Sequence, residues 1–184
     1  MAVLGAAGHV SMRWKRVSTG DSTARSILES SGELIVRVEG KNRISTDARL
    51  RVRSFGSAVE SFRVRLPRGM ELVPTSPVGY RVEVVSDPAT SMMEADSSKR
   101  PAQVVEVRLD RPTNSVIEVR LLAALVPDSQ NGGMALEPAE FDVLGAVRQR
   151  GTVDFVVEGD WNLSWTEDSS VRRIDAETDV ASPA

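Results

Sequence analysis

The sequence predicts an all-β protein, a single antiparallel β-sandwich of about ten strands with long loops. Three observations favour this class. Apolar and polar residues alternate with a period of two in one segment after another, which is typical of strands buried on one face. No comparable stretch has the periodicity of a helix. The chain has 184 residues, which is enough for one well-buried core and ordinary for one sandwich.

Ten segments carry the alternation, and their apolar residues are expected to point into one shared core. In chain order these segments are 10–14, 34–38, 48–52, 62–66, 80–84, 105–109, 117–121, 141–144, 153–157 and 161–165. Near the end, Val171 and Ile174 allow one further strand at an edge. The predicted domain therefore spans 1–174, and 175–184 is predicted to be a disordered tail.

The spacing also suggests two hairpins. A turn at 56–58 sets three inward pairs, Val52 with Phe62, Leu50 with Val64 and Ala48 with Leu66. A turn at 110–114 sets three more, Leu109 with Ile117, Val107 with Val119 and Val105 with Leu121. The outward pairs of the second hairpin are then Arg108 with Glu118 and Glu106 with Arg120. Such opposite charges stabilise a strand pair by roughly 0.2–1 kcal/mol.

Between the strands, the sequence predicts long loops at 86–103 and 127–140, where Asp, Ser, Pro, Asn and Gly accumulate. No apolar run approaches the length of a transmembrane helix. The first residues lack the basic leader of a secretory signal, so for an exported protein we expect the signal elsewhere or on a longer parent chain.

Composition excludes several kinds of site. The chain has no cysteine and one histidine, His9, which rules out disulfides and leaves too few ligands for zinc. His9 has no accompanying G-x-S-x-G elbow and is interpreted as a surface histidine. No glycine pattern suits a phosphate, so we predict no cofactor and no metal. The formal net charge of -3 does not point to nucleic acid.

Carboxylates are the remaining candidates for catalysis. Glu83, Glu106 and Glu118 occupy outward strand positions beside arginines, where solvated cross-strand pairs are favoured over a glycosidase-like acid pair. Asp175, Glu177 and Asp179 alternate in a way that could present oxygens to calcium, but the glycine and distal glutamate of an EF-hand are missing. We therefore expect no catalytic residue.

Arginines form the first candidate ligand-binding surface. In the first predicted hairpin, Arg51 lies opposite Arg63 and Arg49 lies opposite Arg65. Like charges that face each other are unfavourable unless something anionic compensates them. The compensation could come from an acidic polysaccharide, a lipid head group or nucleic acid. A strand carrying Glu83 or Glu39, or an acidic neighbouring module, could also supply it, and internal compensation is favoured.

The second candidate surface is aromatic. Trp161, Leu163 and Trp165 alternate, so they share one face of a strand. Exposed, Trp161 and Trp165 would suit stacking on sugar rings. The chain has few large aromatic residues, so burial in the core is favoured.

Two segments resemble elements of β-sandwich modules in very large bacterial cell-envelope proteins. One is the run 61–72, which reads as a strand ending in a Leu-Pro-x-Gly motif at Leu66 to Gly69. The other is 143–153, a strand and turn followed by a strand, with Trp161 beyond it. The resemblance covers about 34–174. It implies an architectural or adhesive module, without carrying over a catalytic residue.

Three functions follow as hypotheses. The first is a non-catalytic structural or interaction module, a unit of a larger surface or envelope protein whose partners are neighbouring modules or an anionic glycan. The second is a carbohydrate-binding module that uses Trp161, Trp165 and Tyr80, or the arginines for acidic glycans. The third is a glycoside-active domain that uses a carboxylate pair. The envelope or another extracytoplasmic site is the expected location.

Overall fold

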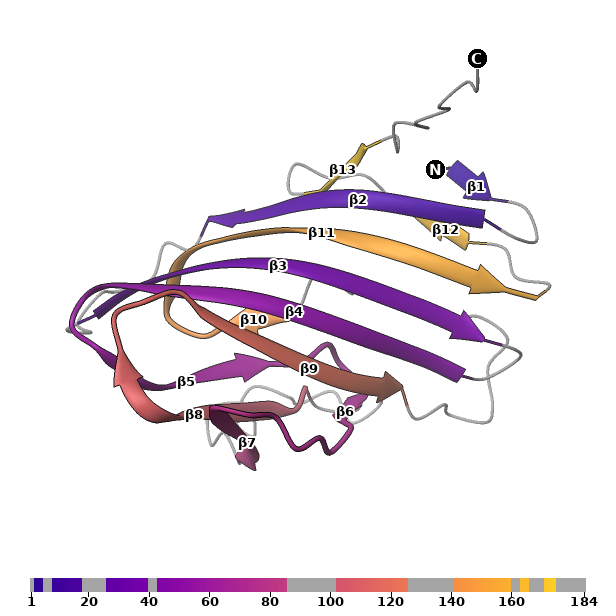
Figure 1. Cartoon of the computed structure of the whole chain (residues 1–184). Coiled ribbons are helices and arrows are strands. Elements are labelled where there is room, and N and C mark those ends of the chain that lie inside the picture. The colour runs from indigo at the N-terminus through magenta and orange to yellow at the C-terminus, as the bar shows by residue number, and fades with distance from the viewer. Residues whose placement is uncertain are drawn as a thin grey trace, which may run out of the picture.

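The computed structural model describes residues 2–4, 8–17, 26–39, 43–85, 102–125, 141–159, 163–165 and 171–174. Side chains are described for 27–39, 43–85, 102–125 and 141–159. These residues form thirteen strands and no helix (Figure 1), so the predicted all-β class is confirmed. The strands are β1 Ala2–Leu4, β2 Gly8–Val17, β3 Ser26–Glu39, β4 Arg43–Gly56, β5 Val59–Arg65, β6 Met70–Leu72, β7 Tyr80–Val85, β8 Val104–Thr113, β9 Ile117–Leu125, β10 Asp142–Val143, β11 Ala146–Glu158, β12 Leu163–Trp165 and β13 Val171–Ile174.

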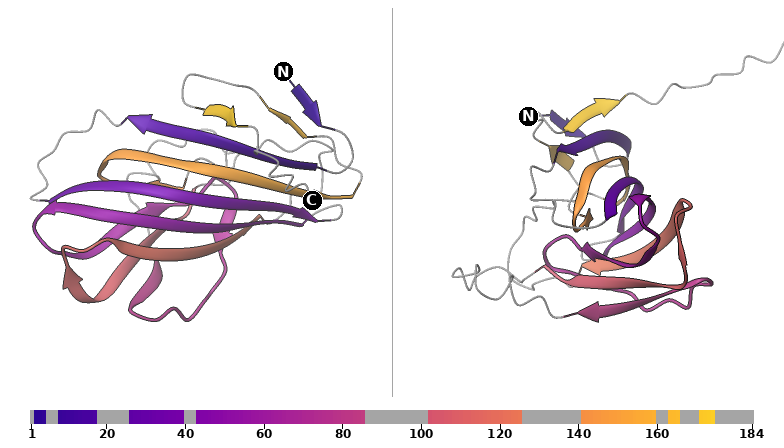
Figure 2. Two further views of the ribbon diagram at one scale, coloured as in Figure 1. Left: turned by 45° about the horizontal axis from the view of Figure 1, so that its top comes forward. Right: turned by 90° about the vertical axis from the view of Figure 1, so that its left-hand side faces the viewer.

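The strands form three sheets. The large sheet has seven strands in the order β13-β2-β11-β3-β4-β9-β6, and the small sheet has four in the order β10-β5-β8-β7. The strands β1 and β12 make a separate two-stranded pair. In Figure 2 the large sheet curves over the small one. Each alternating segment predicted from the sequence overlaps a strand, and the edge strand predicted from Val171 and Ile174 is β13.

One strand pair departs from the predicted antiparallel arrangement. Strand β11 lies between β2 and β3, antiparallel to β2 and parallel to β3. The two strands β11 and β3 are far apart in the sequence, and the alternation within a strand carries no information about the direction of a distant partner. The parallel pair therefore has no signature in the sequence.

The inner faces of both sheets contribute to one hydrophobic cluster. Leu34, Val36 and Leu50 come from the large sheet, and Phe62 and Val107 come from the small sheet; all five are at most 4% exposed. This is the shared core that the period-two pattern predicted. Burial of each such side chain stabilises the fold by about 1.5–3 kcal/mol.

Both predicted hairpins are wrong in their pairing. Strand β4 pairs with β3 and β9, whereas β5 pairs with β8 and β10. The chain does turn at Gly56, which has a φ of 108°, but it passes there from the large sheet to the small one. Val52 and Phe62 are both buried as predicted, although they belong to different sheets.

The second connection crosses between the sheets in the same way. Strand β8 ends at Thr113 in the small sheet and β9 begins at Ile117 in the large sheet. The segments β4–β5 and β8–β9 are therefore two antiparallel arms that bend together (Figure 1). Strands that switch sheets at such corners keep their inward alternation. Alternation predicted the inward residues correctly and could not distinguish a tight hairpin from this corner.

Local contacts fix the ends of two strands. The Leu-Pro-x-Gly motif forms a turn in which the Met70 amide donates to the Pro67 carbonyl at 3.1 Å, and Gly69 has a φ of 76°. The buried Gln149 side chain accepts a hydrogen bond from the Val143 amide at 2.8 Å and donates one to the Phe141 carbonyl. Gln149 thereby ties β10 to β11.

Some of the predicted segments lie outside the described residues. These are most of the first predicted long loop (86–101), the second predicted long loop (127–140) and the predicted tail from Asp175.

Candidate binding face

Arginines gather on the outer face of the large sheet, which we call the arginine face. Six of them come from three of its strands: Arg49, Arg51 and Arg53 from β4, Arg120 from β9, and Arg148 and Arg150 from β11. All six are exposed. Strand β3 runs between β4 and β11 and places Glu29, Ser31 and Glu33 along the middle of this face.

The arginine ladder predicted from the sequence does not exist. Arg49 and Arg51 lie on the large sheet, whereas Arg63 and Arg65 lie on β5 in the small sheet. The reason is the corner at Gly56, which separates the strands that the predicted hairpin joined. Arg63 lies opposite Glu106, and Arg65 forms an ion pair with Asp142 at 3.8 Å. The structure therefore brings together two of the four predicted arginines.

Two arginines of the arginine face are neutralised within the sheet. Arg51 Nε donates to Glu118 Oε1 at 2.8 Å, and the two side chains are 63% and 69% exposed. Such an exposed pair contributes at most about 1 kcal/mol. Arg120 lies directly opposite Arg49, but its guanidinium turns to Asp47. Compensation within the protein, which the sequence favoured, accounts for these two arginines.

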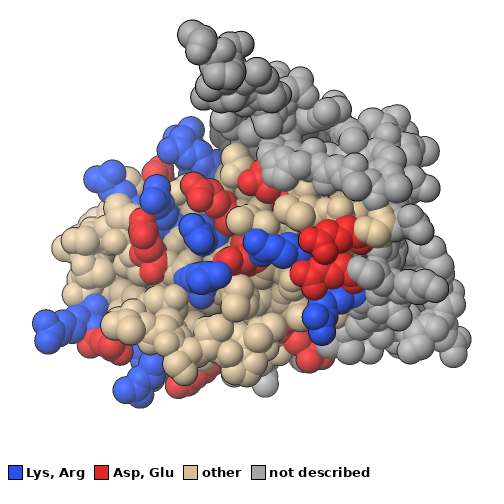
Figure 3. Space-filling view, turned by 45° about the vertical axis from the view of Figure 1, so that its right-hand side comes forward, with Lys and Arg blue, Asp and Glu red and all other residues tan. Residues whose placement is uncertain are grey.

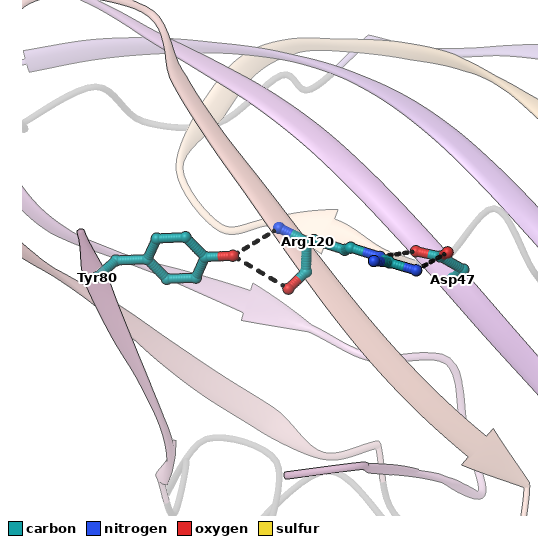
Figure 4. A network of polar contacts seen from close by, with 3 residues as sticks. All are labelled: Asp47, Tyr80 and Arg120. Atoms are coloured by element: carbon teal, nitrogen blue, oxygen red, sulfur yellow. Dashed lines mark hydrogen bonds and ion pairs between the residues drawn. The ribbon is translucent and has the colours of Figure 1, made fainter. Parts of the chain in front are cut away.

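Asp47, Arg120 and Tyr80 form a network that spans the two sheets (Figure 4). Arg120 donates from Nε to Asp47 Oδ1 at 2.9 Å and from Nη2 to Oδ2 at 2.7 Å. This bidentate bond is the main reason that the pKa of the buried Asp47 carboxyl is lowered; burial opposes it, and the charges of Arg120, Arg49 and Arg37 add to it. The same bond raises the pKa of Arg120. Both groups are therefore charged at neutral pH.

Tyr80 completes this network from the small sheet. Its hydroxyl accepts a hydrogen bond from the Arg120 amide at 2.9 Å and donates one to the Arg120 carbonyl at 3.3 Å. The amide and carbonyl of Arg120 point away from β4, towards the side of β9 where β6 pairs only with 123–125. The tyrosine thus takes the place of a partner strand for one residue and joins β7 to β9.

A hollow of about 780 Å³ lies on the arginine face. Its lining includes five arginines, Arg49, Arg51, Arg120, Arg148 and Arg150, against two glutamates, Glu33 and Glu118. The small residues Ser31, Gly32, Gly151 and Thr152 make up the middle, where β3 and β11 run side by side. Small residues surrounded by long arginines explain why the surface is hollowed here.

Three arginines of this hollow have no acidic partner in the part of the chain that the structure describes. Among the described residues, no carboxylate lies within ion-pair distance of Arg49, Arg148 or Arg150. On the face of the molecule that Figure 3 shows, basic and acidic side chains are interspersed. Arg148 and Arg150 were missed at the sequence level, because Gln149 and Gly151 hold the inward positions beside them and interrupt the apolar alternation.

The aromatic candidates are only partly described. Trp161 lies outside the described residues. Trp165 ends β12, where it pairs with Ala2 of β1, and its side chain is not described. His9 lies in β2 opposite Val156, and its side chain is likewise not described. Tyr80 is half-buried and contributes to the hollow. The predicted tryptophan strip stays a prediction.

The carboxylates considered for catalysis are distributed over both sheets. Glu118 pairs with Arg51 on the large sheet. Glu83 and Glu106 lie opposite each other on the small sheet, where Glu106 contacts Arg108 at 3.0 Å and Ser61 at 3.4 Å. Within the described ranges, no group of three or more potential metal ligands is found. Asp175, Glu177 and Asp179 lie outside those ranges.

The same ranges contain no helix long and apolar enough to cross a bilayer.

Comparisons with known proteins find similarity only at the level of structure. No protein-family model matches this sequence, and no curated protein matches it either. A two-domain M1 zinc metallopeptidase variant bound to L-tryptophan is similar with a TM-score of 0.36 and 22% identity, over 59% of this chain and 22% of that chain. A variant from Deinococcus radiodurans bound to a Tyr-Ser-Ala substrate gives 0.35 and 18%, over 64% and 24%. This chain spans about a quarter of their length, and similarity at this level supports no conclusion about its function.

Proposed function

We propose that this chain is a non-catalytic interaction module, a sandwich of two sheets whose arginine face binds a polyanionic partner. The observation that carries the proposal is the hollow lined by five arginines and two glutamates, in which Arg49, Arg148 and Arg150 have no acidic partner among the described residues. Exposed arginines that the protein leaves uncompensated attract anions, most strongly where several of them converge.

The balance of charge supports the same proposal. The whole chain carries a formal charge of -3, so the excess of arginine in the hollow is local. On the small sheet the charges are mixed: Arg63 lies opposite Glu106 and Arg108 contacts the same glutamate, whereas Arg81 lies opposite Arg108. A face on which several arginines without an acidic partner converge, on a protein of negative net charge, orients an anionic partner towards that face.

The proposal includes neighbouring modules of a larger envelope protein as one source of the partner. That context comes from the resemblance of 61–72 and 143–153 to cell-envelope modules, and it stays a prediction. The Leu-Pro-x-Gly part of the resemblance corresponds to the turn at 67–70, a structural element rather than a site.

Two double variants with the same change in net charge test the proposal on a heparin column. Arg148→Gln with Arg150→Gln removes two arginines of the hollow, and Arg63→Gln with Arg81→Gln removes two exposed arginines of the small sheet. We expect the native protein to be retained, the first variant to elute at clearly lower salt, and the second to elute close to the native protein. No retention of the native protein, or equal shifts of both variants, would contradict the proposal.

A further inference from the structure

We infer that the hollow has one defined anion seat above Ser31, and that this seat takes the carboxylate of an acidic saccharide. The inference rests on the proposed function and narrows it to one position and one class of ligand. It comes from the way the register of the large sheet arranges charges in rows across the strands.

The rows differ in whether β3 supplies an acid. In one row, Glu29 lies between Arg148 and Arg53 in the register, although no ion pair joins it to either of them within the described ranges. In another, Glu33 lies beside Arg49. In the row between them, Arg150 and Arg51 flank Ser31 instead. An acid is therefore missing at the middle of three successive outward positions of β3, and a bound carboxylate would occupy the space above it.

The geometry of the sheet makes this row a suitable seat. Neighbouring strands lie about 4.8 Å apart, so the backbones at Arg150 and Arg51 are about 10 Å apart across Ser31. Arginine side chains are long enough to converge over that distance, and their guanidinium groups bind carboxylates through two parallel hydrogen bonds. Among the described residues the Ser31 hydroxyl has no hydrogen-bond partner, so it is free to bind the ligand. Arg150 has no acidic partner in the part of the chain that the structure describes. Arg51 donates from Nε to Glu118 at 2.8 Å, which leaves its terminal nitrogens for a ligand.

The other groups around the seat favour a saccharide over nucleic acid. Glu33 and Glu118 line the same hollow, beside the hydroxyl-bearing residues Ser31 and Thr152. Carboxylates repel a densely charged phosphate backbone, but they accept hydrogen bonds from sugar hydroxyls. A uronic acid carries one carboxylate among several hydroxyls, which matches this mixture of arginine, carboxylate and hydroxyl groups. An open face of a sheet also leaves room for a chain of sugar rings to pass over it.

The test is isothermal titration of the whole protein with an oligogalacturonate, with a neutral galacto-oligosaccharide and with single-stranded DNA of similar length. The variant Ser31→Glu supplies the missing acid in the row and should weaken oligogalacturonate binding at least about tenfold. The matched control Ser31→Thr keeps a neutral hydroxyl and should change binding by no more than about threefold. The neutral saccharide should bind much more weakly than the acidic one.

The outcomes separate this inference from the proposed function. If Ser31→Glu leaves oligogalacturonate binding unchanged, the anion binds elsewhere on the face, and the inferred site above Ser31 is wrong. If DNA binds more tightly than oligogalacturonate, the inferred ligand class, an acidic saccharide, is wrong. The proposed function as a polyanion-binding module would still hold. If none of the anionic probes binds, and the heparin column does not retain the protein, the proposed function itself is wrong.

Discussion

The outer faces of the two sheets are built from the same alternation and differ in how their charges are matched. On the small sheet, arginines and glutamates are mixed: Glu106 lies opposite Arg63 and contacts Arg108, while Arg81 lies opposite Arg108. On the large sheet, Arg148 and Arg150 stand at the edge of a hollow without an acidic partner among the described residues. Period-two alternation determines that both faces are polar. The register between strands decides which arginines lie beside an acid and where several unpaired arginines converge. The two sheets differ in this register.

The inner faces provide the contrast to this difference, because both sheets contribute to one core. Leu50 from the large sheet and Leu66 beyond the end of β5 are each at most 1% exposed. We expect Leu50→Ala and Leu66→Ala each to lower the free energy of unfolding by about 2–5 kcal/mol. Urea denaturation followed by fluorescence measures both.

Val84→Ala is the matched control for these truncations, since Val84 is 55% exposed on β7. It should change stability by less than about 0.5 kcal/mol. A large loss for Leu50→Ala beside a negligible loss for Leu66→Ala would mean that the two sheets are not stabilised by one common core.

A second pair of variants compares the carboxylates that are bonded to arginine on the two sheets, Asp47 on the large sheet and Glu106 on the small one. Asp47 is 7% exposed and bonded at both oxygens by Arg120, whereas Glu106 is 18% exposed and contacts Arg108 through one oxygen. Asp47→Asn should lower the free energy of unfolding at pH 7 by about 1.5–3 kcal/mol, because charged hydrogen bonds are lost. Glu106→Gln should cost less than about 1 kcal/mol.

The pH dependence provides an independent check on Asp47. Its pKa is lower in the folded protein than its usual value, chiefly through the bond from Arg120. The stabilisation is therefore fully present above the unfolded pKa of about 3.9 and is lost as the pH falls through the folded value. The difference in stability between the native protein and Asp47→Asn should be largest at neutral pH and shrink in acid. A difference that stays constant down to acid pH would rule out the ionised carboxylate as its source.

Sequence alternation predicted which residues are buried, and it did not predict which strands are neighbours. Val52 and Phe62 point inward as expected, because the side-chain period within a strand is a local property. Their predicted contact within one hairpin fails because a corner at Gly56 and a tight hairpin impose the same local pattern. Partner choice depends on contacts between distant segments, such as β3 with β11.

The candidate site was hidden for a related reason. The inward positions beneath the hollow are Ser30 and Gly32 on β3, and Gln149 and Gly151 on β11. None of them is apolar and large, so the alternation fades in both strands at the same level of the sheet. Leu50 fills the space at Gly32, where an added Cβ would lie 3.0 Å from Leu50 Cδ2. The sequence therefore indicated the site only through the loss of apolar alternation at 26–33 and at 146–152. The structure shows that these two segments are neighbours.

The smallest expected effect concerns the link between the two sheets at Tyr80. Tyr80→Phe removes one hydroxyl and leaves the Arg120 amide and carbonyl without that partner. Both bonds are exposed, so water can replace the hydroxyl in part, and the loss of stability should be about 0.5–1.5 kcal/mol. Hydrogen exchange of the Arg120 amide should quicken about tenfold, because this amide relies on the hydroxyl. The Leu121 amide is the internal control, since adjacent residues of an antiparallel strand direct their amides to opposite sides. Equal protection of the Arg120 amide in both proteins would mean that the tyrosine packs against β9 without bonding it, and that the two faces are joined through the core alone.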